Sequence, residues 1–203
     1  MKKYLISGMP PGYSGTGRLL DALIPNAKKD GFKVIMPVLT PPLSLLVKNR
    51  DIKGLRKKII YNKITRKIIF HIQTAHIKNA IILFLHPQSA GFKRFLSLIK
   101  SNEMYYYVLD NSFFCARSYN NNPITEKECF ICLKNPEKIL PECMPCPVRY
   151  EKQKYINYLK KLKKYADRLV FFAQNENQKK LLIKSRAHNL CRKSFSMIQT
   201  KVL

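Results

Sequence analysis

The sequence is poor in acidic residues and has no long apolar segment. Asp and Glu account for 12 of the 203 residues and Lys and Arg for 38, so the formal charge is +26. No uncharged apolar run reaches the roughly 18 residues that a membrane-spanning helix needs. Residues 1–6 have no adequate apolar region or cleavage site for a signal peptide, and we interpret them as a β-strand. These absences predict a cytoplasmic protein.

The rest of the composition indicates one folded domain. Hydrophobic residues make up 46% of the chain, which is enough to bury a core and excludes wholesale disorder. A length of 203 residues fits one domain of ordinary size. In a reducing compartment the six cysteines are expected to be metal ligands or free thiols before they are disulfides.

Positive charge is concentrated in residues 48–67 and 152–164. The first segment has nine Lys or Arg residues against one Asp, and the second has six Lys residues and no acid. Part of the charge is compositional, because Lys, Ile and Asn are abundant along the whole chain, as they are in proteins of AT-rich genomes. A basic amphipathic helix can lie on an anionic membrane surface, bind nucleic acid, or simply be a solvated helix face. The sequence leaves these alternatives open.

The amino-terminal residues predict a β–loop–α–β unit. Residues 4–6 are a short apolar run, residues 18–29 have leucines at helical spacing, and residues 32–38 form a second apolar run. Pro25 is expected to kink or shorten the helix, and Gly31 suits the position just after it. Two strands joined by a helix in this way are parallel, with a right-handed crossover.

Further strands and helices alternate along the chain. We expect strands at residues 68–72, 80–85, 105–109 and 168–173. We expect helices at residues 43–58, 91–100 and 150–165, and a last helix that Asn175 caps with Gln178 as its capping-box partner. The alternation predicts a doubly wound, mostly parallel Rossmann-like α/β sheet over residues 1–185. Residues 111–147 form a Cys-rich insert, held by something other than an apolar core, and residues 186–203 a poorly ordered basic tail.

Polar residues follow several of the predicted strands. In open parallel sheets, ligands bind outside the carboxyl ends of the strands, so residues 12–17, His86 and Asp110 with Asn111 should converge on one edge. His86 is either packed on a neighbour or in contact with substrate as a proton relay. Asp110 either accepts a hydrogen bond from a sugar hydroxyl or caps the following turn. No Ser-His-Asp set and no histidine metal motif is visible.

Glycines 12, 15 and 17 lie between the first strand and the first helix. Glycine lets the backbone turn tightly and lets a ligand approach the amide groups, and the helix that follows favours a phosphate. The spacing is not that of the dinucleotide fingerprint, and the absence of a following Gly-Lys-Ser/Thr excludes a P-loop. The alternatives are a contact with phosphate or sugar phosphate, and a tight turn without ligand.

Four cysteines form two short-spaced pairs, Cys129 with Cys132 and Cys143 with Cys146. Each pair can hold one side of a tetrahedral metal, since two intervening residues allow a tight knuckle turn. Four thiolates suit a structural zinc ion, or an iron–sulfur cluster. Disulfides and uncoordinated thiols are the alternatives, and Cys115 could replace one ligand. We expect zinc to be bound.

Several segments together resemble the amino-terminal half of a bacterial glycosyltransferase of the GT-B fold, family 4-like. They are SGMPPGYSGTGR (7–18), LFLHPQSAGF (83–92), LDNSFFCARSYN (109–120), ECFICL (128–133) and ADRLVFFAQN (166–175). The resemblance covers roughly residues 1–185, and the Cys-bearing segment is its most specific part.

The resemblance implies transfer of a sugar from a nucleotide-sugar donor to a saccharide or lipid-linked acceptor. In this family two Rossmann-like domains face each other across a cleft, and the amino-terminal domain mainly binds the acceptor. By position, the loop facing the donor's diphosphate would contain Gly12, Gly15, Thr16 and Gly17. His86 and Asp110 would be the catalytic candidates on the acceptor side.

No segment matches the family's carboxyl-terminal, nucleotide-binding domain. Because catalysis needs both sides of the cleft, we expect the chain to be inactive or very weak alone. A truncated or frameshifted gene, or a separate partner that supplies the donor-binding half, would account for this. Lipid-linked acceptors would place the protein at the inner membrane face, in contact with anionic lipid. The alternative function is a metal-stapled nucleic-acid-binding module that uses the Cys knuckles, the basic helices and the tyrosines at 105–107.

Overall fold

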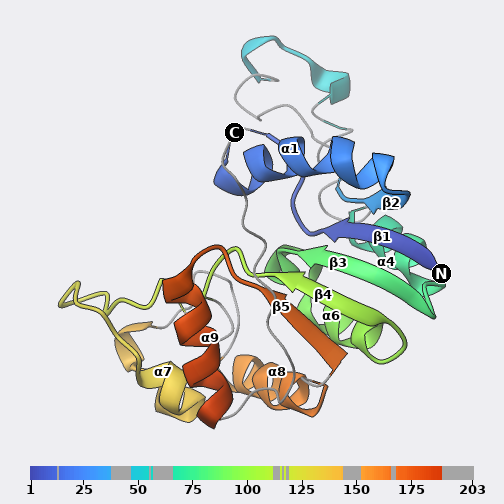
Figure 1. The fold of residues 1–203 in the computed structure, drawn as a ribbon. Coiled ribbons are helices and arrows are strands. Elements are labelled where there is room, and N and C mark those ends of the chain that lie inside the picture. The colour runs from blue at the N-terminus through green and yellow to red at the C-terminus, as the bar shows by residue number, and fades with distance from the viewer. Residues whose placement is uncertain are drawn as a thin grey trace.

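The computed structural model describes residues 1–12, 14–37, 47–54, 56, 66–111, 115, 117, 119–143, 152–165 and 168–188. Its centre is a five-stranded sheet in the order β2-β1-β3-β4-β5, in which every neighbouring pair is parallel (Figure 1). The strands are β1 (Lys2–Ser7), β2 (Phe32–Ile35), β3 (Ala80–Leu85), β4 (Glu103–Tyr107) and β5 (Leu169–Phe172). The predicted doubly wound α/β fold is confirmed.

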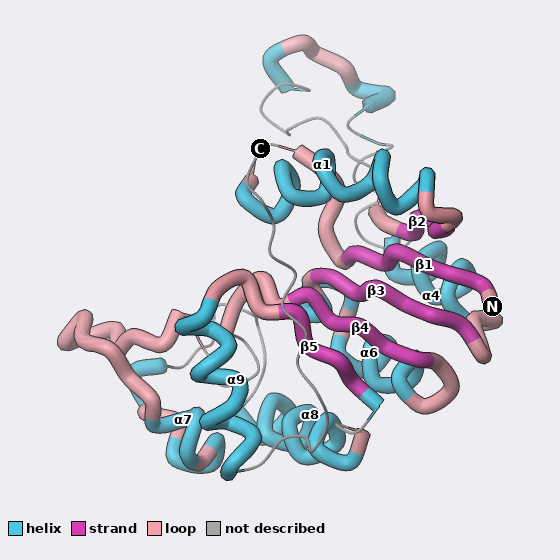
Figure 2. Tube along the Cα trace, viewed as in Figure 1, coloured by secondary structure: helices cyan, strands magenta, loops and turns pink. Residues whose placement is uncertain are grey.

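Helices lie on both faces of this sheet (Figure 2). They are α1 (Gly15–Lys29), α4 (Arg66–Ala75), α6 (Phe92–Ile99), α8 (Lys152–Lys164) and α9 (Glu176–His188), with the short turns α5 (Pro87–Ala90), α7 (Ile131–Lys134), η2 (Pro136–Lys138) and η3 (Pro141–Cys143). Leu20 of α1 shares one buried cluster with Leu5 of β1. Ile6 belongs to the opposite cluster, with residues of α4, α6 and α8. Successive side chains of β1 thus enter two different cores.

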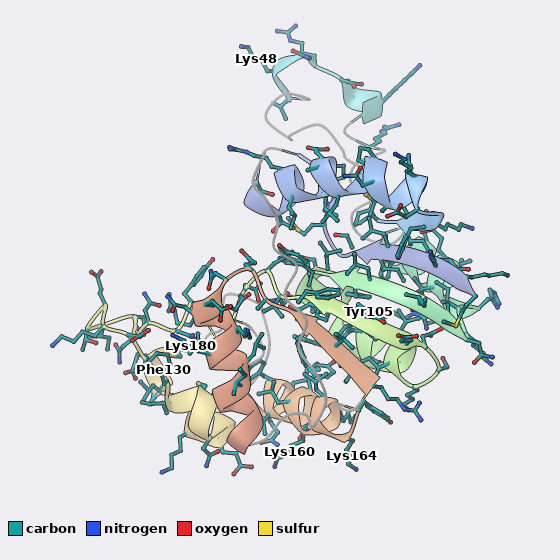
Figure 3. The ribbon with its side chains drawn as sticks, in the orientation of Figure 1. Lys48, Tyr105, Phe130, Lys160, Lys164 and Lys180 are labelled. Carbon is teal, nitrogen blue, oxygen red and sulfur yellow. The ribbon has the colours of Figure 1, made fainter. Side chains whose placement is uncertain are left out.

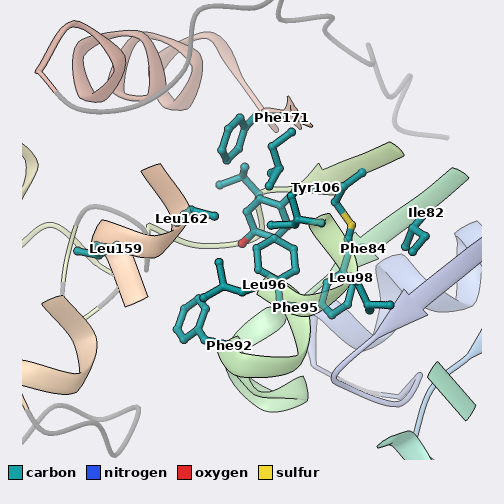
Figure 4. Packing of buried hydrophobic residues seen from close by; sticks show 14 of the residues in the cluster. Ile82, Phe84, Phe92, Phe95, Leu96, Leu98, Tyr106, Leu159, Leu162 and Phe171 are labelled. Carbon is teal, nitrogen blue, oxygen red and sulfur yellow. The ribbon is translucent and has the colours of Figure 1, made fainter. Parts of the chain in front are cut away.

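The larger core is built on aromatic rings from α6 and three strands (Figure 4). The ring of Phe95 lies 4.8 Å from that of Phe84 and 5.7 Å from that of Tyr106, both edge to face. Tyr106 meets Phe171 in the same way at 5.9 Å. Such pairs contribute roughly 0.5–1.5 kcal/mol each beyond the area they bury. They fix β3, β4 and β5 relative to one another, and so align the loops that follow these strands.

The predicted strand at residues 68–72 is wrong, because these residues lie in α4. Phe70 and Thr74 are buried one helical turn apart, and Thr74 Oγ1 donates a hydrogen bond to Phe70 O at 2.6 Å. Ile68 and Ile72 are 50% and 58% exposed. A strand would have placed both isoleucines on the same face as Phe70. Their β-branched side chains favoured a strand, but the helical spacing of the buried residues prevailed.

Other predicted elements occur with shifted ends. The first helix begins at Gly15 and continues through Pro25 to Lys29. Of the predicted helix at residues 43–58, the structure describes residues 47–54 and 56, and this part is not one continuous helix, because a turn at residues 49–50 separates helical residues 47–48 from 52–54. The expected basic tail at residues 186–203 also lies outside them, apart from the end of α9. Within the described parts of the chain, no helix is long and apolar enough to cross a membrane.

The Cys-rich insert packs on the domain, in contrast to the expectation that no apolar core holds it. Cys132, Ile139 and Cys143 are buried in the same cluster as the large aromatic core. Cys132 lies in α7, Cys143 in η3 and Ile139 just after η2; α7 lies beside α9, and η2 lies beside α8. The prediction failed because the insert supplies its apolar residues singly, without a period that marks a helix or strand.

Candidate functional site

The carboxyl ends of β1 and β3 form the switch point of the sheet. After β1 the chain enters α1 on one face, and after β3 it enters α5 and α6 on the other. Ligands of open α/β sheets bind in the crevice at such a point. Gly8 N donates to Leu85 O at 3.0 Å, and a Cβ at Gly8 would lie 2.3 Å from His86 O and 2.5 Å from Ala90 N. Only glycine allows the two loops to approach this closely.

The glycine loop folds back on the first turn of α1. Ser14 caps the helix, and its Oγ accepts a hydrogen bond from Gly17 N at 3.1 Å. A Cβ at Gly17 would lie 2.4 Å from Gly12 O and 2.7 Å from Gly12 N. Gly12 itself has a φ of 151°, which favours glycine. A tight turn without ligand, one of the two alternatives for this loop, is therefore sufficient to explain why positions 12 and 17 are glycine.

Gly15 and Thr16 are the part of this loop that is open to a ligand. Gly15 is exposed, Thr16 is half-buried, and a Cβ at Gly15 would meet nothing within 4 Å. Both residues lie in the first turn of a helix of 15 residues, where the N–H groups and the helix dipole favour an anion. Phosphate contact stays a prediction, and it rests on these two residues.

His86 follows β3 with a left-handed backbone, at φ 55° and ψ 63°. This conformation is uncommon for a residue with a side chain and often occurs at functional sites. The residue is half-buried, and its carbonyl accepts a hydrogen bond from Ala90 N at 3.4 Å. The strained backbone therefore holds His86 at the switch point, against Gly8.

Asp110 is oriented by a residue that sequence reasoning did not single out. Gln88 Nε2 donates to both carboxylate oxygens of Asp110, each at 2.7 Å. Gln88 follows β3 and Asp110 follows β4, so this contact joins two loops at the carboxyl edge of the sheet. Both side chains are half-buried. The only feature of the sequence that could have pointed to a role for Gln88 is its position three residues after a buried strand.

Asn111 has a buried acceptor that is not satisfied. Its Oδ1 is buried, and no group in the described part of the chain donates a hydrogen bond to it. The backbone is fixed, because Asn111 O accepts from Cys115 N at 2.8 Å. A buried acceptor left without a donor costs about 1–3 kcal/mol. A ligand hydroxyl or amide at this edge would recover that cost.

The loop after β5 lies at the same edge of the sheet and is bonded to the loop after β4. Val108 N donates to Phe172 O at 3.0 Å, and Gln174 Nε2 donates to Val108 O at 2.8 Å. The predicted cap of α9 by Asn175 is confirmed, since Asn175 Oδ1 accepts from Gln178 N at 2.9 Å, but the reciprocal bond of the predicted capping box goes to Gln174 N and not to Asn175 N. Gln178 Oε1 in turn accepts from Gln174 N at 2.8 Å. These contacts hold the loops after β4 and β5 together.

Three of the four predicted metal ligands are described, together with Cys115. Cys115, Cys132 and Cys143 are buried and Cys129 is partly buried, and none of the four is in a disulfide. Cys146 lies outside the described residues. Over the described ranges, no set of three His, Cys, Asp or Glu residues is already arranged to hold a metal ion.

The charges around Cys143 place other insert residues near it. Burial raises the pKa of the Cys143 thiol above its usual value. The negative charges of Cys115, Cys129 and Glu142 raise this pKa further, while the positive charge of Arg117 lowers it. Residues 115, 117 and 129 are thus close to Cys143, although 14 to 28 positions separate them along the chain.

The basic helix α8 has its apolar face buried. Tyr155, Ile156 and Leu159 are 3%, 3% and 9% exposed, and the ring of Tyr158 lies 5.5 Å from that of Phe92 in α6. The exposed face carries Lys154, Lys160, Lys161 and Lys164. Because the apolar face of α8 is buried in the domain, this helix can attract a membrane or a nucleic acid only through the positive charge of its exposed lysines.

The other basic segment lies at the opposite end of the molecule, as the positions of Lys48 and Lys160 show (Figure 3). Of residues 48–67, the structure describes exposed basic side chains at Lys48, Arg50, Lys53 and Arg56. Val47 and Ile52 beside them are 60% and 66% exposed. The two basic segments therefore form two separate surfaces, and only this one combines positive charge with exposed apolar side chains.

The tyrosines at 105–107 are strand residues of β4. Tyr106 and Tyr107 are 0% and 5% exposed, and Tyr105 stacks on Phe172 at 5.6 Å (Figure 3). Nucleic-acid-binding proteins use exposed aromatic rings as platforms for bases. Tyr106 and Tyr107 are not available for that role.

Comparison with known proteins identifies no family for this chain. No family model matches it, and no curated protein matches it.

Proposed function

We propose that this chain is the acceptor-side domain of a glycosyltransferase, and that its saccharide site is the carboxyl edge of the sheet. The observation that supports this best is the pair Asp110 and Asn111. Gln88 holds the Asp110 carboxylate in one orientation, and the adjacent Asn111 Oδ1 is a buried acceptor to which none of the described residues donates. Two adjacent acceptors of this kind suit neighbouring sugar hydroxyls.

The other residues of the edge have roles consistent with this proposal. His86 lies at the switch point, where its imidazole would exchange a proton with an acceptor hydroxyl. Gly15 and Thr16, in the first turn of α1, would face the diphosphate of the donor. A separate donor-binding domain would complete the site, because sugar transfer requires both substrates in one geometry.

Membrane association belongs to the same proposal. Val47 and Ile52 are exposed among basic side chains, which suits an anionic lipid surface on which a lipid-linked acceptor is presented. This surface is distant from α8 (Figure 3). The helix α8 would contribute only long-range attraction.

The test is a binding assay with a panel of free mono- and disaccharides and of polyprenyl-diphosphate-linked sugars in neutral detergent micelles. At least one member should bind the full chain, and Asp110→Asn should weaken that binding by about 10- to 100-fold through loss of a charged hydrogen-bond acceptor. The control is Asp30→Asn, at the far end of α1. Binding of no member, or equal binding by wild type and Asp110→Asn, would contradict the proposal.

The second candidate is a nucleic-acid-binding module, favoured by the exposed lysines of α8. Their charge alone would give sequence-independent binding whose affinity falls steeply with salt. The burial of Tyr106 and Tyr107 removes the aromatic platform that would make such binding selective. Tight, salt-dependent binding to DNA or RNA, abolished by reversing the α8 charges, would support this candidate over the first.

A further inference from the structure

The Cys-rich insert begins at the candidate saccharide site, because its first residue is Asn111. It leaves the sheet after β4 and extends beside α9 (Figure 1). Cys115 N donates to Asn111 O at 2.8 Å, and Asn120 N donates to Cys115 Sγ at 3.3 Å. Arg117 is two positions from Cys115, a span of at most about 7 Å along the chain. The first part of the insert therefore folds back beside the carboxyl edge of the sheet.

The backbone that follows this part is held by several contacts. Asn121 forms an antiparallel bridge with Glu128. Asn122 Nδ2 donates to Glu142 Oε1 at 3.2 Å, which ties the turn of the insert to η3. The Asn122 Oδ1 accepts from Ile124 N at 2.8 Å within that turn. Side chains of residues 117–122 thus project from a fixed backbone.

Three buried polar atoms of the insert have no hydrogen-bond partner among the described residues. They are Arg117 Nε, Asn121 Oδ1 and the Asn111 Oδ1 already noted. Buried polar groups of folded proteins are nearly always paired. One donor and two acceptors left over within residues 111–121 indicate that this part of the insert faces a polar ligand.

Arg117 carries the only charge among these three residues. Its side chain is half-buried, and no described Asp or Glu lies within ion-pair distance of it. The carboxylate of Glu142 is bonded to Asn122 instead. Water can satisfy an amide, but it cannot neutralise a guanidinium, and a partly buried cation favours a counter-charge. A planar guanidinium binds a carboxylate or a phosphate with two parallel hydrogen bonds.

We propose that the insert recognises an anionic group, a carboxylate or a phosphate, on the acceptor saccharide, and that Arg117 binds this group. The inference rests on the proposed function and narrows its substrate class to acidic saccharides. Asp110 would repel the anionic group, so the group lies on the side of the sugar that faces the insert. Rotation about the single bonds of the Arg117 side chain brings its guanidinium to the ligand.

The test is isothermal titration calorimetry of the full chain with matched sets of sugars. Each set contains a hexose (glucose, galactose or mannose), its uronic acid and its 6-phosphate. At least one acidic member should bind at least about tenfold more tightly than its neutral counterpart, because a charge-assisted hydrogen bond is stronger than a neutral one. The uronic acids and the 6-phosphates separate a carboxylate from a phosphate. Equal affinity for acidic and neutral members in every set would overturn the proposal.

Arg117→Met separates specific recognition from the general attraction of anions by a chain of charge +26. It should reduce the affinity for the acidic member to that for the neutral one and leave the neutral one unchanged. Lys127→Met is the matched control, since it removes one positive charge from an exposed position of the same insert. It should keep the preference for the acidic member. Equal loss of the preference in both variants would overturn the proposal.

Asp110→Asn distinguishes failure of this inference from failure of the proposed function. If this variant weakens the binding of neutral sugars while acidic sugars have no advantage in wild type, the proposed function stands and the inference about Arg117 is wrong. If no sugar binds wild type, both are wrong.

A measurement on the unmodified chain covers the case in which Arg117→Met does not fold. Wild type is treated with phenylglyoxal, which modifies arginine, and the modified positions are identified by mass spectrometry. A saturating concentration of the tightest-binding acidic sugar should protect Arg117 and leave Arg50, in the distant basic segment, reactive. Modification of Arg117 at the same rate with and without the sugar would overturn the proposal.

Discussion

Gly17 is the residue of α1 that the backbone of Gly12 approaches closely in the glycine loop. A methyl group there would lie 2.4 Å from Gly12 O, a backbone atom that has no alternative rotamer. We expect Gly17→Ala to lower the free energy of unfolding by about 1–3 kcal/mol, as overpacking does in buried sites. Urea unfolding followed by far-ultraviolet circular dichroism measures this.

Gly15→Ala is the matched control two positions away. A methyl group at Gly15 meets no atom within 4 Å. Alanine is the better helix former, so stability should be unchanged or higher by up to about 1 kcal/mol. Equal effects of Gly15→Ala and Gly17→Ala would show that helix propensity, not loop packing, governs both positions.

Tyr105 should titrate above its usual range. Its hydroxyl donates to the Glu103 carboxylate, and this bond, then burial and the charge of Glu103, raise the pKa of Tyr105 above 10.0. Because the folded-state pKa is the higher one, this contribution to stability is complete below the unfolded pKa near 10. It is lost as pH rises through the folded-state pKa.

Glu103→Gln removes the carboxylate and should bring the pKa of Tyr105 down toward 10.0. Nuclear magnetic resonance of ring-labelled tyrosine measures this pKa, with Tyr105→Phe used to assign the signal. The decline of stability above pH 10 should also be smaller in Glu103→Gln than in wild type, because equal folded- and unfolded-state pKa values leave no pH-dependent contribution from Tyr105. An unchanged Tyr105 titration would disprove the hydrogen bond.

The positions of some residues of the candidate site were predictable where they follow a buried strand. His86 and Asp110 lie at the predicted edge because the carboxyl ends of parallel strands share an edge, while their roles stay predictions. Gln88 and Gly8 were not singled out, because their roles depend on a loop from another strand. Contacts between loops leave no periodic pattern in the sequence, so the pairing of Gln88 with Asp110 required coordinates.

At the scale of elements, α9 depends on its cap. Asn175→Ala removes the acceptor of the Gln178 N–H, which should cost about 1 kcal/mol of stability. Asn177→Ala, at an exposed position in the first turn, is the control and should be neutral. Thermal unfolding of both variants measures the difference. Equal melting temperatures would mean that the cap does not stabilise the domain.

Helix caps and continuous apolar runs made some helices and strands predictable. Segments that mix exposed and buried apolar residues led to wrong predictions. Strand β3 was predicted with its observed ends, because a six-residue apolar run bounded by polar residues indicates a strand buried on both faces. Helix α4 was missed, because its isoleucines are exposed and only Phe70, Thr74 and the following Ile77 are buried. The hydrophobicity of single residues did not reveal which face of the segment packs on the sheet.

At the scale of the whole molecule, the two basic segments place their described side chains on separate surfaces (Figure 3). The sequence predicted two basic helices but not that the apolar face of α8 is buried against Phe92 of α6. That packing depends on Phe92 and Tyr158, which are 66 positions apart, beyond the reach of any local pattern. The doubly wound sheet was predictable, because the alternation of strands and helices extends over most of the chain.

The central claim is that the functional site lies at the carboxyl edge of the sheet. Hydrogen–deuterium exchange, with and without the tightest-binding sugar of the panel, tests it most directly. We expect slower exchange in residues 8–17, 86–91 and 108–111, with α8 and residues 47–56 unchanged. Slower exchange confined to α8 or to residues 47–56, with the loops at the carboxyl edge unaffected, would contradict it.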